Sequence, residues 1–138
     1  MQEGVSFAKL DLEAGERFVR LRGELGIESF GLNLLVLQPG QGGRIHRHKR
    51  QEEAYIVLEG TLTLEIEGEQ VHTLTRGDAA RVAPGVRRRL SNRSAERVAL
   101  LAMGGAEPHE GRDGVAYLDW DDAEGRPPAD VPLPDDLT

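Results

Sequence analysis

Short apolar segments separated by turn signals recur from about residue 30 to residue 105, and this pattern limits the fold more than any other feature. The clearest is Thr61–Ile66, in which apolar and polar residues alternate. Alternation places successive side chains on opposite faces of a strand, with Leu62, Leu64 and Ile66 facing inward. No segment shows a helical period. The chain is therefore predicted to be all-β, folded as a sandwich or closed barrel.

The remaining strands are predicted from apolar runs bounded by glycine, proline or aspartate. Phe30–Leu37 is apolar at neighbouring positions, so both of its faces are expected to be covered. Before it, residues 5–25 are expected to form one or two short strands, with Phe7, Phe18 and Leu21 buried. The other predicted strands are Glu53–Glu59, Gln70–Thr75, Ala79–Ala83, Val98–Met103 and an edge strand at Val115–Leu118.

The composition is that of one domain. At 138 residues the chain is long enough to bury a core, and its lack of cysteine excludes disulfides and thiol chemistry. The first residues lack a basic stretch followed by an apolar one, and no apolar run is long enough to cross a bilayer. We expect a soluble cytoplasmic protein without a membrane partner.

The formal net charge of −7 is concentrated toward the end of the chain. From Ala106 onward acidic residues far outnumber basic ones, so the rest of the chain is nearly neutral. Basic residues cluster near residues 44–50 and 76–97. Aromatic residues do not interleave with them, so we expect no nucleic-acid partner. A small anionic molecule fits this charge pattern better.

Two histidines and a carboxylate form the candidate site. In an extended strand His46 and His48 point to one face and Arg47 to the other. Glu53 begins the next apolar strand, and a hairpin would bring its carboxylate beside both rings. Two imidazoles and a carboxylate on a rigid sheet are a recognised ligand set for a divalent metal ion. Tyr55 is expected to face inward with Glu53, as a proton donor, a substrate contact or a packing residue.

The spacing G-x5-H-x-H-x4-E-x6-G, which runs from Gly40 to Gly60, resembles the first motif of the cupin superfamily. The resemblance implies an antiparallel jelly-roll β-barrel, the double-stranded β-helix, with His46, His48 and Glu53 directed into its mouth. It further implies a bound manganese, iron, nickel or zinc ion. The alternative is that these polar residues lie on a solvated hairpin.

Residues 77–92 resemble the second cupin motif, G-x5-P-x-G-x2-H-x3-N, with two departures. The proline falls one residue late, at Pro84, and Arg88 occupies the place of the third metal-binding histidine. Arginine stays protonated and offers no lone pair, so it cannot act as a ligand. Either Arg88 turns aside and the metal binds His46, His48, Glu53 and water, or Arg88 pairs with Glu53 and no metal binds.

The resemblance divides the chain into residues 1–29, N-terminal strands that could act as a dimer arm, a cupin barrel at residues 30–104, and an acidic, proline-rich tail at residues 105–138. Within the tail, residues 125–134 are expected to be extended or disordered. On the strand that begins at Glu53, Ala54, Ile56 and Leu58 point outward and need a cover. The N-terminal strands or a second subunit could supply it, and cupins commonly pair through such sheets, so a homodimer is expected.

Fold alone does not assign a reaction. One hypothesis is a metal-dependent oxygenase or isomerase that acts on a small anionic substrate. Its catalytic candidates are Glu53, Tyr55 and Arg88, the last holding the anionic group of the substrate. The other hypothesis is a metal-free module that binds or senses a small ligand without turnover.

Overall fold

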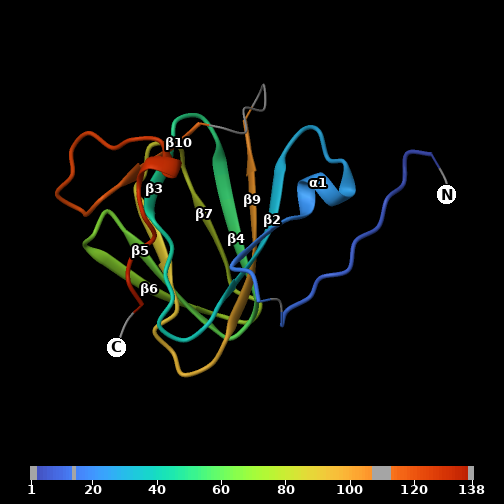
Figure 1. Cartoon of the computed structure of the whole chain (residues 1–138), viewed down its shortest axis with the longest axis horizontal. Coiled ribbons are helices and arrows are strands. Elements are labelled where there is room, and N and C mark those ends of the chain that lie inside the picture. The colour runs from blue at the N-terminus through green and yellow to red at the C-terminus, as the bar shows by residue number, and fades with distance from the viewer. Residues whose placement is uncertain (1–2, 14, 107–112, 137–138) are drawn as a thin grey trace.

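The computed structural model describes residues 3–13, 15–106 and 113–136, which form two facing five-stranded antiparallel sheets (Figure 1). The first sheet contains, in spatial order, β1 (Phe18–Arg20), β2 (Gly31–Leu37), β9 (Val98–Gly105), β4 (Glu52–Glu59) and β7 (Ala79–Val82). The second contains β10 (Gly114–Tyr117), β3 (Ile45–His48), β8 (Arg88–Ser91), β5 (Thr61–Ile66) and β6 (Gln70–Thr75). The all-β jelly-roll prediction is confirmed.

The main core lies between the two sheets and is built by alternation along the strands. Leu62 and Leu64 of β5 are buried and Ile66 packs against them, as predicted. Tyr55 and Val57 of β4 face them from the other sheet, each 1% exposed. The pleat therefore directs Tyr55 and, two residues before it, Glu53 toward the interior.

A second apolar cluster covers the outer face of the first sheet. Leu34 and Val36 of β2 pack there against Leu21, while Leu37 belongs to the main core. Both faces of β2 are thus covered, as its sequence predicts. Leu58 of β4 joins this second cluster, so the segment before β2 supplies part of the cover that the outward residues of β4 require.

The prediction for residues 5–25 is wrong in part. Only three residues form β1, and the next five, Leu21–Leu25, form the one-turn helix α1. Gly26 ends this helix with φ 72°, the left-handed conformation that favours glycine. Leu21 is buried, but Phe7 is 85% exposed and Phe18 is 49% exposed. A single helical turn is too short to show a period in the sequence, and Phe18 lies on an edge strand beside a cavity.

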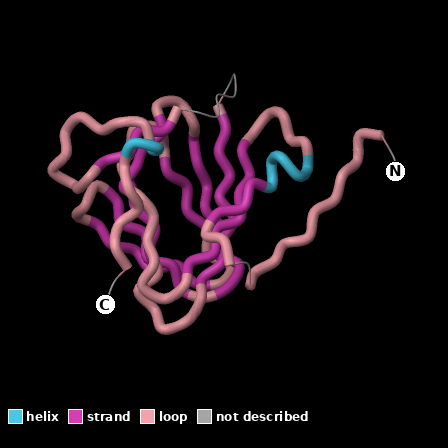
Figure 2. Tube along the Cα trace, in the orientation of Figure 1, coloured by secondary structure: helices cyan, strands magenta, loops and turns pink. Residues whose placement is uncertain are grey.

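Residues 113–136 return to the barrel. Their first strand, β10, pairs with β3 in the register Gly114↔His48 to Tyr117↔Ile45, close to the predicted edge strand. The following loop ends in the 3-10 helix η1 (Pro128–Asp130), and Val131 beyond it is 3% exposed (Figure 2). The proline-rich stretch therefore packs against the barrel, whereas its sequence predicts an extended or disordered chain.

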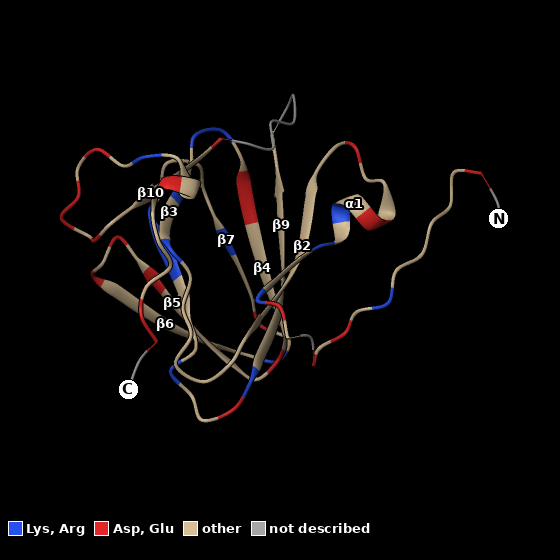
Figure 3. Ribbon diagram, viewed as in Figure 1, with Lys and Arg blue, Asp and Glu red and all other residues tan. Residues whose placement is uncertain are grey.

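Charge is unevenly distributed over this fold. Acidic residues occur in the loop after β10, basic residues occur along β3, and α1 carries one of each (Figure 3). In the described part of the chain, no helix is long and apolar enough to cross a membrane.

Candidate metal centre

The two histidines come from one sheet and the glutamate from the other. His46 and His48 lie on the same side of β3, with their ring centroids 5.3 Å apart and their planes at 87°. Glu53 lies on β4, which pairs with β7 and β9 and not with β3. The predicted proximity is therefore present. However, Glu53 meets the histidines across the space between the two facing sheets, and β3 and β4 do not form a hairpin.

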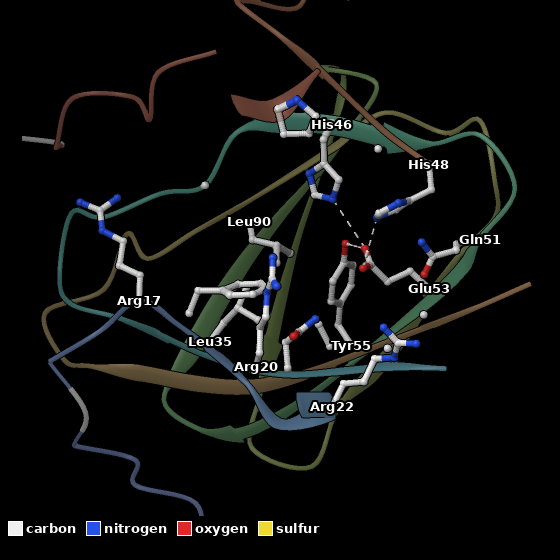
Figure 4. Close-up of a pocket in the computed structure, with 18 of the residues that line it drawn as sticks. Arg17, Arg20, Arg22, Leu35, His46, His48, Gln51, Glu53, Tyr55 and Leu90 are labelled. Carbon is white, nitrogen blue, oxygen red and sulfur yellow. Dashed lines mark hydrogen bonds and ion pairs between the residues drawn. The ribbon is translucent and has the colours of Figure 1, made fainter. Parts of the chain in front are cut away.

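The three side chains converge on one point (Figure 4). His46 Nε2 is 3.6 Å from Glu53 Oε1, and His48 Nε2 is 3.4 Å from Glu53 Oε2. One ligand atom from each residue lies within 4.8 Å of the others. The arrangement could hold a metal ion, which excludes the alternative of polar residues scattered on a solvated hairpin.

The second nitrogen of each ring is engaged by an acceptor. His46 Nδ1 lies 3.1 Å from the backbone oxygen of Arg44, and His48 Nδ1 lies 2.8 Å from Asp113 Oδ1. Because both partners are acceptors, Nδ1 carries the proton in each ring. Each Nε2 atom is thereby directed toward the centre, where loss of its proton would leave a lone pair for a ligand. Metal-binding histidines typically have this type of outer support.

Asp113 is the organising residue that the sequence analysis missed. Its carboxylate accepts hydrogen bonds of 2.7 Å from the backbone N–H groups of Arg50 and Gln51 and from the Gln51 side chain. Burial by itself raises the pKa of Asp113, but these hydrogen bonds and that of His48 outweigh it and lower the pKa to about 2. One ionised carboxylate thus holds both the β3–β4 connection and the His48 ring.

Nothing in the sequence separates Asp113 from the other acids of the C-terminal segment. It precedes a short strand and belongs to neither cupin motif. Only the pairing of β10 with β3 brings it next to His48. This long-range contact could not be read from local pattern.

Arg88 lies beneath the site, opposite His46 in the β3–β8 register. Its side chain is fully buried and donates to Glu53 Oε1 at 3.0 Å, to Tyr55 Oη at 3.2 Å and to the backbone oxygen of Val86 at 2.6 Å. Tyr55 in turn donates its hydroxyl hydrogen to Glu53 Oε1. Of the two arrangements open for Arg88, the structure contains the pairing with Glu53. Oxygen Oε1 is engaged by this pair, whereas Oε2 faces His48.

Coupling within the site shifts the pKa values. Burial favours a raised pKa for Glu53, but hydrogen bonds with His46 and His48 outweigh it and lower the pKa well below its usual value. Burial would lower the pKa of His48, but Glu53 and Asp113 raise it overall. Burial and the neighbouring Glu53 raise the pKa of Tyr55 well above its usual value. Glu53 is therefore ionised and Tyr55 neutral near pH 7.

These residues fit a divalent ion in donor type and direction. Two imidazole nitrogens and a carboxylate oxygen suit manganese, iron, nickel or zinc. Burial alone would lower the pKa of Arg88, but Tyr55 and Glu53 stabilise its charged form and raise the pKa. The guanidinium therefore cancels the charge of Glu53. A metal here would therefore receive less net negative charge than one bound by an unpaired carboxylate.

A cavity of about 1020 Å³ adjoins the three ligands. His46, His48, Glu53 and Tyr55 line it, and Arg88 does not. Arg17, which precedes β1, Arg20 of β1 and Arg22 of α1 also line it.

Comparison with known proteins identifies the family. The profile of the cupin domain matches residues 33–104. The chain is a cupin. The resemblance of its two motifs is thereby confirmed, and the matched region includes both histidines, Glu53 and Arg88. A comparison with curated proteins finds no significant match.

Solved structures share the cupin's fold. A cupin protein from Bacteroides fragilis is 25% identical, with a TM-score of 0.66 over 76% of this chain and 86% of the other. A sugar phosphate isomerase of the cupin superfamily from Silicibacter pomeroyi is 28% identical, with a TM-score of 0.62 over 85% of this chain and 79% of the other. A protein with a double-stranded β-helix domain from Klebsiella pneumoniae, 15% identical, has a TM-score of 0.64 over 80% and 97% and shows the fold alone.

Proposed function

We propose that this cupin binds a divalent metal ion through His46, His48 and Glu53 and acts on a small anionic molecule in the adjoining cavity. The observation that carries the proposal is the fixed direction of both rings. Each Nδ1 is engaged by an acceptor, so both Nε2 atoms face Glu53, where they could bind a shared ion. A packing role for the histidines would not require this arrangement.

When bound, a manganese, iron, nickel or zinc ion would supply Lewis acidity at this point. The chain's own residues position and tune the site. Tyr55 and Arg88 hold Glu53 Oε1, which also lies 3.6 Å from His46 Nε2, and Oε2 is directed toward His48. Asp113 fixes His48. Tyr55 is neutral and lines the cavity, so its hydroxyl is the candidate donor to a substrate if its hydrogen is redirected from Glu53 Oε1.

An isomerase is the reaction class that the comparisons favour over an oxygenase. The similar protein from S. pomeroyi is described as a sugar phosphate isomerase, and it covers most of this chain. Isomerisation requires a proton donor and acceptor close to a polarised oxygen. Replacement of Tyr55 by Phe, which keeps the ring packing, tests whether its hydroxyl contributes.

Metal analysis of untagged protein tests the proposal. After dialysis against manganese, iron, nickel or zinc and then metal-free buffer, we expect about one ion per chain. His46→Ala and Glu53→Ala should abolish this binding. His72→Ala is the matched control, because His72 lies exposed on β6. Absence of every metal from the unaltered protein, or equal loss in the His72 variant, would contradict the proposal.

A metal-free binding module is the second candidate function, and the Arg88–Glu53 ion pair favours it. That pair already satisfies the buried carboxylate without a metal. In this case ligand binding should be unaffected by chelators and should depend on the cavity alone. Calorimetry with and without a chelator distinguishes the two functions.

A further inference from the structure

The cavity beside the metal centre differs in character from one part to another. The metal ligands His46, His48 and Glu53 line one part of it. Arginines from β1 and α1 lie on the side away from the imidazoles in Figure 4. An additional arginine, Arg44, lines the cavity next to β3. The cavity is thus positively charged at a distance from the metal centre.

These arginines differ in the partners that they have in the described part of the chain, where Arg44 donates from Nε to the backbone oxygen of Val131. Arg20 is exposed, and among the described residues neither it nor Arg22 forms an ion pair. Arg22 Nη2 donates to the backbone oxygen of Glu28 at 3.2 Å, but its buried Nε has no partner in the described part of the chain. Arg17, by contrast, pairs with Asp136 at 3.2 Å.

Guanidinium groups directed at a cavity with unused donors favour an anion. The carboxylate of Glu28 also lines this wall and opposes such binding, but the arginines outnumber it. A carboxylate or a phosphate would satisfy the free donors of Arg20 and Arg22.

Apolar side chains also line the cavity, together with the polar side chain of Asn33. Leu35 and Leu37 of β2, Leu90 of β8 and Ala102 of β9 all line it. Leu37 and Leu90 also belong to the main core, so they cannot turn away to admit water. A polyol lying against these apolar side chains would lose water from its hydroxyls without gaining partners from them, although Asn33 also lines the cavity. A hydrocarbon body would instead gain from burial.

We infer that the ligand of this cupin is an acid with an apolar body, whose carboxylate or phosphate binds Arg20 and Arg22 while its hydrocarbon part crosses Leu35, Leu37 and Leu90. For the end of the ligand that reaches the metal, this inference rests on the proposed function. It assigns a substrate class different from the sugar phosphates named for the S. pomeroyi neighbour, because a sugar carries hydroxyls along its whole length.

Matched pairs of probes test the apolar body. Adipate and galactarate share a carbon chain and two carboxylates, and differ in the hydroxyls. Hexyl phosphate and sorbitol 6-phosphate differ in the same way and carry a phosphate. The probes are titrated by calorimetry into the full manganese-loaded chain. In at least one pair, we expect the affinity of the hydrocarbon member to exceed that of its polyol partner by about tenfold or more. Comparison of the two pairs shows whether the head group is a carboxylate or a phosphate.

Charge variants test the arginines. Arg20→Gln and Arg22→Gln should each weaken the better hydrocarbon probe by about tenfold, through loss of a charge-assisted hydrogen bond. Arg76→Gln removes the same charge from an exposed position outside the cavity and should leave binding unchanged. Because Arg20 is exposed, its variant is expected to fold even if substitution of Arg22 disturbs α1.

The outcomes separate this inference from the metal proposal. If hexyl phosphate binds a chain that takes up no manganese, the metal function fails and the inference stands. If manganese binds but the polyols bind as tightly as their hydrocarbon partners, the inference is overturned and the metal centre stands. Equal behaviour of the Arg20, Arg22 and Arg76 variants, or no binding of any probe, also overturns it.

Discussion

At the scale of single residues, Arg88 is the side chain that most distinguishes this site from the motif it matches. It places a buried positive charge against the carboxylate that a metal would share. Arg88→His removes that charge and offers an imidazole at the motif's third histidine position. We expect divalent-metal affinity to rise by about tenfold or more.

Manganese titration monitored by electron paramagnetic resonance measures the change. Arg89→His, on the neighbouring position of β8, removes a charge that pairs with Glu65 away from the site and is the control. An unchanged affinity in Arg88→His would show that the guanidinium does not limit metal binding.

Asp113 makes a pH-dependent contribution to stability. Its pKa in the folded protein, about 2, lies below the ordinary value of 3.8. The unfolded chain therefore takes up the proton first as pH falls, so the contribution is complete above about pH 4 and is lost toward pH 2. Asp113→Asn should reduce the loss of unfolding free energy over this range, as measured by urea denaturation at several pH values. If the unfolding free energies of both proteins fall equally between about pH 4 and pH 2, Asp113 does not make this contribution.

At the scale of elements, the turn from β4 to β5 depends on Gly60. Its φ is 85°, and an added Cβ would lie 2.3 Å from the backbone oxygen of Arg97. Gly60→Ala should therefore cost about 2–4 kcal/mol of unfolding free energy. Gly77 has φ 86° but no atom within 4 Å of such a Cβ, so Gly77→Ala should cost only about 1–2 kcal/mol. Equal costs, measured by urea denaturation, would show that the contact with Arg97 is relieved by a small shift.

The strands that were predictable from sequence are those with strong local patterns. Thr61–Ile66 and Gln70–Thr75 match β5 and β6 residue for residue, because alternation and a glycine turn delimit them. The N-terminal region fails because a one-turn helix and an edge strand leave no periodic signal. His46, His48 and Glu53 were found by spacing, whereas the crossing between sheets and the role of Asp113 depend on tertiary pairing.

At the scale of the whole molecule, the apolar surface still predicts a homodimer. Phe7 is 85% exposed on the N-terminal arm, which runs beside α1 (Figure 1). On the outer face of the first sheet Ala54, Ile56 and Met103 are only half-buried. Burial of Phe7 against a second copy would contribute about 2 kcal/mol per chain.

Light scattering at micromolar concentration checks this expectation. Phe7→Asp should shift the protein toward the monomer, whereas Val71→Asp, an exposed apolar residue on β6, should not. A monomeric mass for the unaltered protein would refute the dimer.

The hydrogen bond between Asp113 and His48 also affects when the site is completed during folding. A fragment limited to the family match, residues 33–104, would retain all three ligands yet lack β10 and the carboxylate that aims one of them. During synthesis, too, the imidazoles leave the ribosome long before Asp113 does. The arrangement of the three candidate ligands is therefore completed late in folding, when β10 pairs with β3.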